Sequence, residues 1–258
     1  MDGVYLQTQK MQCLQIGEGE KVLFAFHGFG QNSSVFECLR QYLPQYTIYS
    51  FDLLSFGKEP RKQEIYNLIE DFCHSNCVQS FSLLAFSIGS KMALSLTEHF
   101  AEKIEKIVLI APDGFQRNFW YEFAISFIGK PIFWKFIKKP SFFLKIAEFL
   151  SKIKFVDADL LKIAKIYTDS PPKRFLLWRT WLSQKHLFPN HQSLQKIYDE
   201  KPIATRIFVS KTDKLCPVAP IRNFSKNYHC IKIIDSPTQH HRLLGETLRN
   251  PLFLDFLQ

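Results

Sequence analysis

The 258-residue sequence lacks any run of about 18 uncharged apolar residues, so a membrane-spanning helix is not expected. Its first residues, MDGVYLQTQKMQC, lack the basic segment and following apolar stretch of a secretory signal. Charged residues make up only 22% of the chain and hydrophobic residues 46%, which excludes a disordered protein. We therefore expect a globular protein that is kept in the cytoplasm.

Cysteine is sparse, with six residues at positions 13, 38, 73, 77, 216 and 230. Only Cys73 and Cys77 are close, and His74 lies between them. Zinc sites normally need four ligands in tighter pairs, and the sequence has no second pair. We expect reduced, mostly buried thiols and no bound metal.

Acidic residues are scarce in one part of the chain. Residues 115–200 hold 15 Lys and Arg against 7 Asp and Glu, which is +8 of the total net charge of +9. The same segment contains all four tryptophans. This asymmetry marks the segment as a separate basic and aromatic region.

Outside that segment, short apolar runs alternate with amphipathic stretches. Strands are expected at residues 21–27, 46–52, 78–86, 104–111, 203–210 and 230–234, helices at 35–43, 63–75, 88–100, 218–228 and 242–257, and an edge hairpin at 4–16. Continuous apolar strands between helices indicate a mostly parallel, doubly wound α/β sheet. The expected core comprises residues 1–113 and 201–258, and residues 114–200 form a helical insertion.

The third expected strand ends in AFSIGS, which places Ser87 at a strand-to-helix turn. A nucleophilic serine at such a turn has a strained backbone and needs small residues two positions before and after it. Ala85 and Gly89 meet this demand, although glycine is usual at the first position. The alternative is an ordinary turn serine.

The first expected strand ends in His27-Gly28-Phe29-Gly30. Glycines here let the backbone turn so that an amide points toward the serine. With the amide of Ile88, this segment would supply two donors for an oxyanion. A simple glycine turn is the alternative.

Two further strand ends carry a carboxylate and histidines. Asp213 follows residues 203–210, and His240 and His241 follow residues 230–234. A serine nucleophile needs a base and a carboxylate that orients the base. Taken singly, an aspartate in such a turn is more often a turn residue, and either histidine is more often a surface residue. Their occurrence in the order Ser, Asp, His, each at a strand end, favours catalysis.

These motifs together resemble the α/β-hydrolase superfamily, in its cap-bearing serine hydrolase branch. HGFGQNSSVF, AFSIGSKMAL, VSKTDKLCP and QHHRLLGE resemble its oxyanion segment, nucleophile elbow, acid loop and histidine loop. FDLLSFGKEP resembles another family loop, with Leu54 and Ser55 replacing the usual proline and glycine. The family often has Gly-His followed five residues later by Glu, which favours His241, with Glu246, over His240.

The resemblance implies a serine hydrolase that cleaves a carboxylic ester or thioester through an acyl-enzyme. Ser87 would attack, His241 would transfer the proton, Asp213 would orient His241, and the amides of Phe29 and Ile88 would bind the oxyanion. No cofactor is implied. A lyase or acyltransferase of the same fold acting on a small anionic substrate, and a non-catalytic ligand-binding relative, are the alternatives.

The insertion matches the family's cap by position and helical character. One interpretation is that its aromatics cover the core. Another is that they line an apolar acyl tunnel whose basic rim attracts an anionic group, with Trp120 and Phe123 as substrate contacts. A weak membrane-surface contact through the basic aromatic cap is a third interpretation. Single-stranded nucleic acid is not expected as a partner. Lys91, on the helix after Ser87, would either bind a substrate carboxylate or face solvent.

Overall fold

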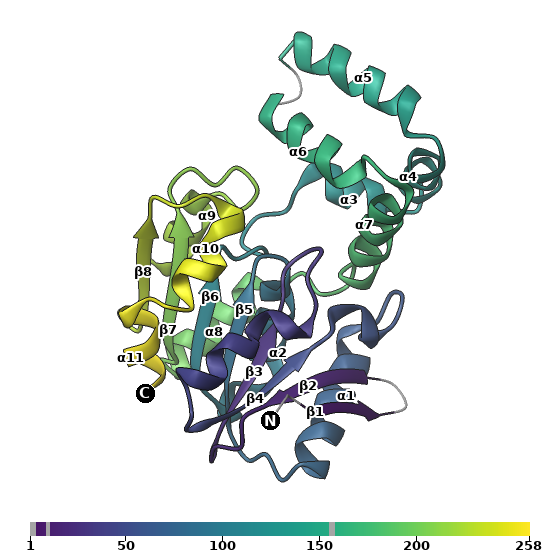
Figure 1. Cartoon of the computed structure of the whole chain (residues 1–258). Helices are drawn as coiled ribbons and strands as arrows, with labels where there is room; N and C mark the ends of the chain where they lie inside the picture. The colour runs from purple at the N-terminus through teal and green to yellow at the C-terminus, as the bar shows by residue number, and fades with distance from the viewer. Residues whose placement is uncertain (1–3, 9–10, 155–157) are drawn as a thin grey trace. The chain divides into compact units, whose positions relative to one another are not determined.

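The computed structural model describes residues 4–8, 11–154 and 158–258 (Figure 1). The chain divides into two compact units. The first comprises Met1–Gln116 and His186–Gln258, and the second comprises Arg117–Lys185.

The first unit is built on an eight-stranded sheet with the strand order β1-β2-β4-β3-β5-β6-β7-β8. The strands are β1 Val4–Thr8, β2 Met11–Ile16, β3 Lys21–Phe26, β4 Tyr46–Phe51, β5 Phe81–Phe86, β6 Ile104–Ile110, β7 Ala204–Ser210 and β8 Ile231–Ser236. β1 and β2 form an antiparallel hairpin, and β2 pairs antiparallel with β4. The remaining pairs are parallel. The expected mostly parallel α/β fold is confirmed.

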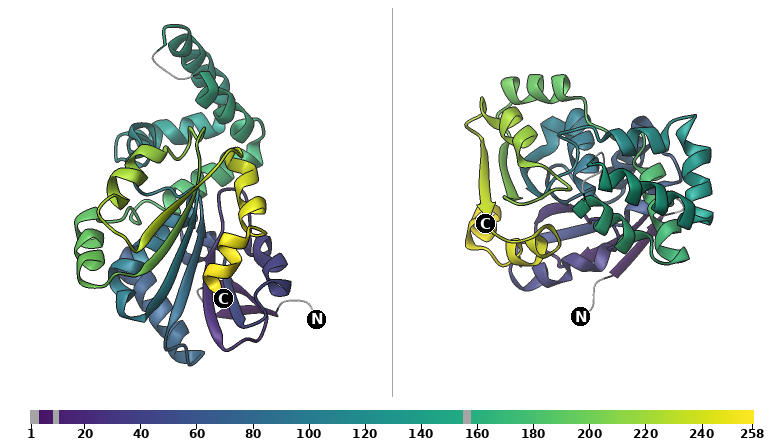
Figure 2. Two further views of the ribbon diagram at one scale, coloured as in Figure 1. Left: turned by 90° about the vertical axis from the view of Figure 1, so that its left-hand side faces the viewer. Right: turned by 90° about the horizontal axis from the view of Figure 1, so that it is seen from above.

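Helices cover both faces of this sheet (Figure 2). One face packs against α1 Lys62–Ser75, α2 Gly89–Phe100, α8 His191–Glu200 and α9 Val218–Ser225. The other packs against the 3-10 helix η1 Ser33–Gln41, α10 His240–Thr247 and α11 Pro251–Leu257. Two short 3-10 helices, η2 Leu53–Phe56 and η3 Ala101–Lys103, complete the unit. The central strands β3, β4 and β5 are mostly buried on both sides, which explains their continuous apolar sequences.

The C-terminal segment differs from the single helix expected at residues 242–257. It forms α10 and α11, and the chain turns between them. The Asn250 side chain accepts a hydrogen bond from the Leu252 N–H, and Pro251 occupies the first turn of α11. An asparagine cap followed by proline starts a new helix, so the first one ends.

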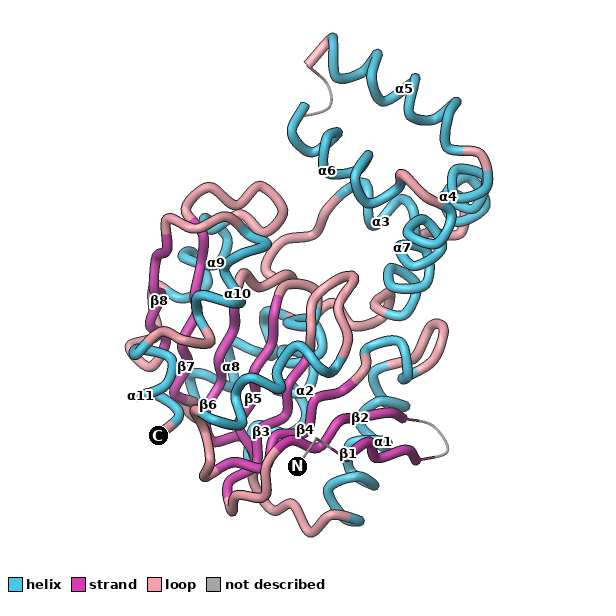
Figure 3. Tube along the Cα trace, in the orientation of Figure 1, coloured by secondary structure: helices cyan, strands magenta, loops and turns pink. Residues whose placement is uncertain are grey.

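The second unit contains α3 Phe119–Ile125, α4 Gly129–Lys138, α5 Pro140–Lys152, α6 Ala158–Thr168 and α7 Pro171–Ser183 (Figure 3). Its buried Arg174 donates hydrogen bonds to the carbonyl oxygens of Ile137 and Thr168. These bonds join α7 to the C-terminal ends of α4 and α6, where backbone carbonyls lack helical partners.

The second unit is shorter than the insertion expected at residues 114–200. Residues 186–200 belong to the first unit. On α8, Leu194 is fully buried in the core of that unit, and the Tyr198 hydroxyl lies 2.8 Å from Thr205 Oγ1 at the start of β7. Helical character alone did not reveal this packing.

In the described part of the chain, no helix combines the length and apolar character that crossing a bilayer requires.

Candidate active site

Ser87 occupies a sharp turn between β5 and α2, with a φ of 51°. Residues other than glycine rarely adopt this left-handed conformation. Hydrogen bonds on both sides hold it. The Ser87 N–H donates to the Ile110 carbonyl at 2.9 Å, and the Ser87 carbonyl accepts from the Ser90 and Asp113 N–H groups at 3.0 and 3.1 Å. The turn is therefore fixed by the adjacent strand β6 as well as by its own helix.

The two small residues beside Ser87 have different roles. A Cβ atom on Gly89 would lie 2.5 Å from the Phe26 carbonyl oxygen, so only glycine fits against the end of β3. Ala85 is fully buried and pairs with Phe26 and Leu109, in a stretch of β5 that keeps its register with β6 from Leu83 to Phe86. The alanine that departs from the usual motif therefore causes no shift of register.

His240, and not His241, lies between Ser87 and Asp213. Its Nε2 is 3.1 Å from Ser87 Oγ, and its Nδ1 is 2.5 Å from Asp213 Oδ2. With Nδ1–H donating to the carboxylate, Nε2 is free to accept from the serine hydroxyl. The expectation that His241 occupies this position is wrong, because the His241 side chain is exposed.

Helix geometry explains the difference. His240 is the first residue of α10, and successive residues on a helix point about 100° apart. When His240 faces Asp213, His241 must face elsewhere. Glu246, whose spacing favoured His241, instead accepts a hydrogen bond from the Thr238 hydroxyl. The Glu spacing therefore reflects a local loop contact.

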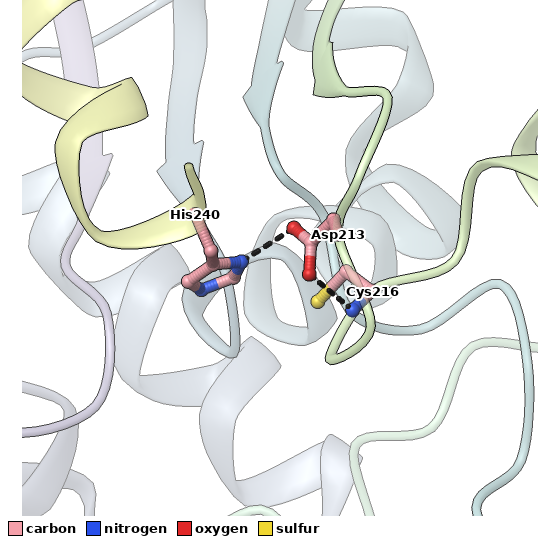
Figure 4. A group of neighbouring side chains, drawn as sticks. All are labelled: Asp213, Cys216 and His240. Atoms are coloured by element: carbon pink, nitrogen blue, oxygen red, sulfur yellow. Dashed lines mark hydrogen bonds and ion pairs between the residues drawn. The ribbon is translucent and has the colours of Figure 1, made fainter. Parts of the chain in front are cut away.

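Asp213 is held in place by backbone amides. Its Oδ1 accepts hydrogen bonds from the N–H groups of Leu215 and Cys216, each at 2.9 Å, and its side chain is only 1% exposed. Figure 4 shows the other carboxylate oxygen directed at His240. Both oxygens are therefore engaged, and the carboxylate has a single orientation toward the imidazole.

Cys216 was not singled out from the sequence, yet it lies beside this group. One group of three potential metal ligands is found within the described residues. It consists of Asp213, Cys216 and His240, whose ligand atoms lie within 4.8 Å of one another (Figure 4). Burial raises the pKa of the Cys216 thiol well above its usual value, and nearby Asp113 and Asp213 raise it further. A metal would need the thiolate and would displace the bonds between His240 and Asp213. The cluster therefore fits a hydrogen-bonded group better than a metal site.

The segment after β3 forms a tight loop. A Cβ on Gly28 would meet the Phe86 ring at 2.6 Å, and Gly30 has a φ of +75°. The Gly28 N–H donates to Gln31 Oε1 at 2.9 Å, and His27 Nδ1 lies 2.8 Å from the Gly28 carbonyl oxygen. Sequence reasoning missed Gln31, whose side chain shapes the loop.

The His27 imidazole is buried and contacts the segment that follows β4. Its Nε2 lies 3.2 Å from Asp52 Oδ1 and accepts the Leu53 N–H at 3.3 Å. His27 therefore connects the loop after β3 to the loop after β4. Phe29 lies within the first loop, and Ile88 precedes α2 at its N-terminus. Their amides stay the predicted oxyanion donors.

Lys91 does not face solvent. Its side chain is only 4% exposed, and its Nζ lies 3.0 Å from Asp113 Oδ2. Because Asp113 already balances its charge, Lys91 is better explained as a structural partner of Asp113 than as a substrate carboxylate ligand. Asp113 in turn donates its N–H to the Ser87 carbonyl, so this ion pair supports the turn that carries Ser87.

Trp120 and Phe123 lie on α3 in the second unit and are 46% and 38% exposed. Both rings contact Phe119, at centroid distances of 5.3 and 6.5 Å. Their role in substrate binding stays a prediction.

Comparison with known proteins agrees with the observed fold. A family model described as the alpha/beta hydrolase fold matches residues 21–197. Two curated proteins of Arabidopsis thaliana are similar over part of the chain. "Probable lysophospholipase BODYGUARD 3" is 34% identical over 106 residues, and "Probable lysophospholipase BODYGUARD 5" is 28% identical over 111. These matches cover 36% and 37% of this chain and 21% and 25% of the relatives, so the chain matches about a quarter of their length at most.

Solved structures resemble nearly the whole chain at low sequence identity. An alpha/beta hydrolase enzyme from a Medee basin deep-sea metagenome library has a TM-score of 0.65 at 13% identity, covering 98% of this chain and 95% of that one. A thermophilic esterase from Thermogutta terrifontis has a TM-score of 0.63 at 14% identity, covering 96% of this chain and 95% of that one. A membrane phospholipase A, a bacterial virulence factor, has a TM-score of 0.63 at 16% identity, covering 99% of this chain and 86% of that one. At these identities the likeness establishes the fold.

Proposed function

The chain belongs to the alpha/beta hydrolase fold family, and we propose that it is a serine hydrolase that cleaves a carboxylic ester or thioester through an acyl-enzyme. One observation carries the proposal. Ser87, His240 and Asp213 form a continuous hydrogen-bonded chain, with 3.1 Å between serine and histidine and 2.5 Å between histidine and aspartate. This is the arrangement of a nucleophile, a base and a group that orients the base.

In the proposed first step, Ser87 Oγ attacks the acyl carbon of the substrate, and its proton passes to His240 Nε2. The Asp213 carboxylate holds the Nδ1–H and stabilises the imidazolium. The tetrahedral oxyanion is bound by the amides of Phe29 and Ile88. The amide of Ile88 is favoured because it lies at the N-terminus of α2, where helix N–H groups attract negative charge.

In the following steps His240 gives its proton to the leaving alcohol or thiol, which departs and leaves the acyl group on Ser87. Water then attacks the acyl-enzyme, with His240 as its base. The acid is released, and the proton returns to Ser87. All proton transfers use the same nitrogen, so a single histidine serves both halves of the reaction.

The substrate class is supported by two further facts. The named relatives include probable lysophospholipases, an esterase and a phospholipase A, and these names describe hydrolysis of carboxylic esters. The second unit exposes aromatic side chains of the kind that bind apolar acyl groups. We therefore favour an ester with an apolar acyl chain.

Labelling and turnover test the proposal. A fluorophosphonate is expected to modify Ser87, identified by peptide mass spectrometry, and Ser87→Ala is expected to abolish hydrolysis in a panel of p-nitrophenyl esters and acyl thioesters. Ser90→Ala is the matched control, because Ser90 Oγ is buried and makes no hydrogen bond within the described residues. Full activity of Ser87→Ala, or labelling elsewhere, would overturn the proposal.

A further inference from the structure

The second unit exposes its apolar side chains to an unusual extent. Of fourteen large hydrophobic residues exposed in the described part of the chain, twelve lie within Arg117–Lys185. The first unit contributes only Leu215 and Leu252. Single exposed apolar residues need no explanation, but gathered ones indicate an interaction surface.

Helix α5 carries the most regular of these surfaces. Phe142, Ile146, Phe149 and Ile153 are 65%, 41%, 63% and 58% exposed. Their spacing of four, three and four residues places them on one side of the helix and its C-cap. We call these four residues the α5 stripe. No residue of α5 is buried.

The neighbouring helices cover a different side of α5. The Phe143 ring contacts Phe136 of α4 at a centroid distance of 5.8 Å. Glu148 accepts a charged hydrogen bond from Lys165 of α6 at 2.6 Å, and Figure 3 shows α5 and α6 side by side. These contacts hold α5 in place while the α5 stripe stays exposed.

Lysines surround the α5 stripe. Lys138 and Lys139 precede α5, Lys145 and Lys152 lie on it, and Lys154 follows it, and all five are exposed. The acidic residue on α5 is Glu148, which pairs with Lys165. Across Arg117–Lys185 the sequence has 14 Lys and Arg against 5 Asp and Glu, which equals the chain's whole net charge of +9.

We propose that the α5 stripe docks the protein onto an anionic lipid surface, with α5 lying in the plane of the interface. An exposed apolar stripe beside lysines matches a bilayer, which offers acyl chains to the former and anionic headgroups to the latter. A second copy of this chain would bring lysines against lysines. The proposal does not depend on the proposed catalytic function, because it rests on α5 alone.

Vesicle binding tests the proposal. Full-length protein is mixed with vesicles of phosphatidylcholine alone, or of phosphatidylcholine with 30% phosphatidylglycerol (roughly the anionic content of a strongly charged leaflet), and bound protein is measured by flotation. Wild type is expected to float with the anionic vesicles and to be released by salt. The variant F142S/I146S/F149S is expected to lose about tenfold or more in partition coefficient.

Three controls separate the possible results. Leu252→Ser removes a 57% exposed leucine from α11 in the first unit and is expected to bind as wild type does. K145Q/K152Q should reduce binding to anionic vesicles and leave hydrolysis of a short soluble ester unchanged. Ser87→Ala should float as wild type does, so a failure of the catalytic proposal leaves this one standing.

Certain results would overturn the docking proposal. One is equal binding by wild type and F142S/I146S/F149S, with both folded by circular dichroism. Another is absence of wild-type binding to the anionic vesicles. A third is a wild-type dimer in sedimentation equilibrium that the variant loses without any vesicle binding, because the α5 stripe would then join two copies.

Discussion

The two units place their aromatic and charged residues in opposite ways. In the first unit Phe24, Phe26 and Phe51 are fully buried, and basic and acidic residues balance, since the second unit accounts for the whole net charge of +9. In the second unit Phe127 and Phe142 are 96% and 65% exposed. A buried, neutral framework suits a group that must hold sub-ångström geometry. An exposed, basic and apolar one suits contact with partners.

The units also differ in the residues that report on them. All six cysteines lie in the first unit and all four tryptophans in the second. Thiol chemistry therefore monitors the first unit, and tryptophan fluorescence monitors the second. A change made in one unit can therefore be followed separately from the other.

The largest effect is expected from the histidine that contacts Ser87. His240→Ala removes the base, so kcat/KM for a p-nitrophenyl ester should fall by about 10⁴-fold. His241→Ala is the matched control. That side chain is exposed, and kcat/KM should stay within about twofold because it contacts no reacting group. Comparable losses in the two variants would contradict the assignment of His240.

A smaller effect is expected at the glycine beside the nucleophile. Gly89→Ala places a Cβ 2.5 Å from the Phe26 carbonyl oxygen, which should lower the free energy of unfolding by about 2 kcal/mol. In Gly245→Ala the new Cβ meets nothing within 4 Å inside α10. That change should raise stability by roughly 0.5 to 1 kcal/mol through helix propensity. Urea unfolding measures the free energy of unfolding of both variants. A Gly89→Ala variant more stable than Gly245→Ala would contradict the close approach at Gly89.

Altering only the second unit should change substrate preference and leave the chemistry intact. Trp120→Ala with Phe123→Ala removes aromatic surface, so kcat/KM for a long-chain ester should fall about tenfold, while that for the acetate should stay within about twofold. Phe175→Ala, at a side chain 48% exposed on α7, is the control. Equal losses on short and long esters would show that the pair does not bind the acyl chain.

The last effect concerns alkaline pH and the first unit. Burial raises the pKa of Cys13 from 9.0 to about 12 and that of Cys73 to about 11. Below pH 9 both states keep the thiol proton. Above it the unfolded chain loses the proton first, so stability falls as pH rises from 9 toward 11, by about 1.4 kcal/mol per thiol at pH 10.

Urea unfolding at pH 8 and pH 10 in reducing buffer checks this prediction. Circular dichroism follows the whole fold, and tryptophan fluorescence follows the second unit. C13A/C73A should lose less stability between the two pH values than wild type does. The same loss in both proteins would show that these thiols are not responsible.

Much of the fold was predictable because its signals are local. Apolar runs bounded by glycine and proline indicate buried strands wherever they occur, and residues 21–27 and 104–111 correspond closely to β3 and β6. The extent of the helical insertion was less predictable. α8 has the same amphipathic pattern as the second unit's helices, and only the packing of Leu194 and Tyr198 assigns it to the first unit.

The candidate site shows the same division. The positions of Ser87 and Asp213 at strand ends were predictable from sequence, because Gly89 and the turn after β7 are encoded within a few residues of each. The spacing to Glu246 favoured His241 over His240, and that prediction was wrong, since both histidines share one local context. The start of α10 settles that choice by directing adjacent side chains about 100° apart. The burial of Lys91 against Asp113 likewise depends on β6 lying beside Ser87, a contact between segments that only the tertiary structure brings together.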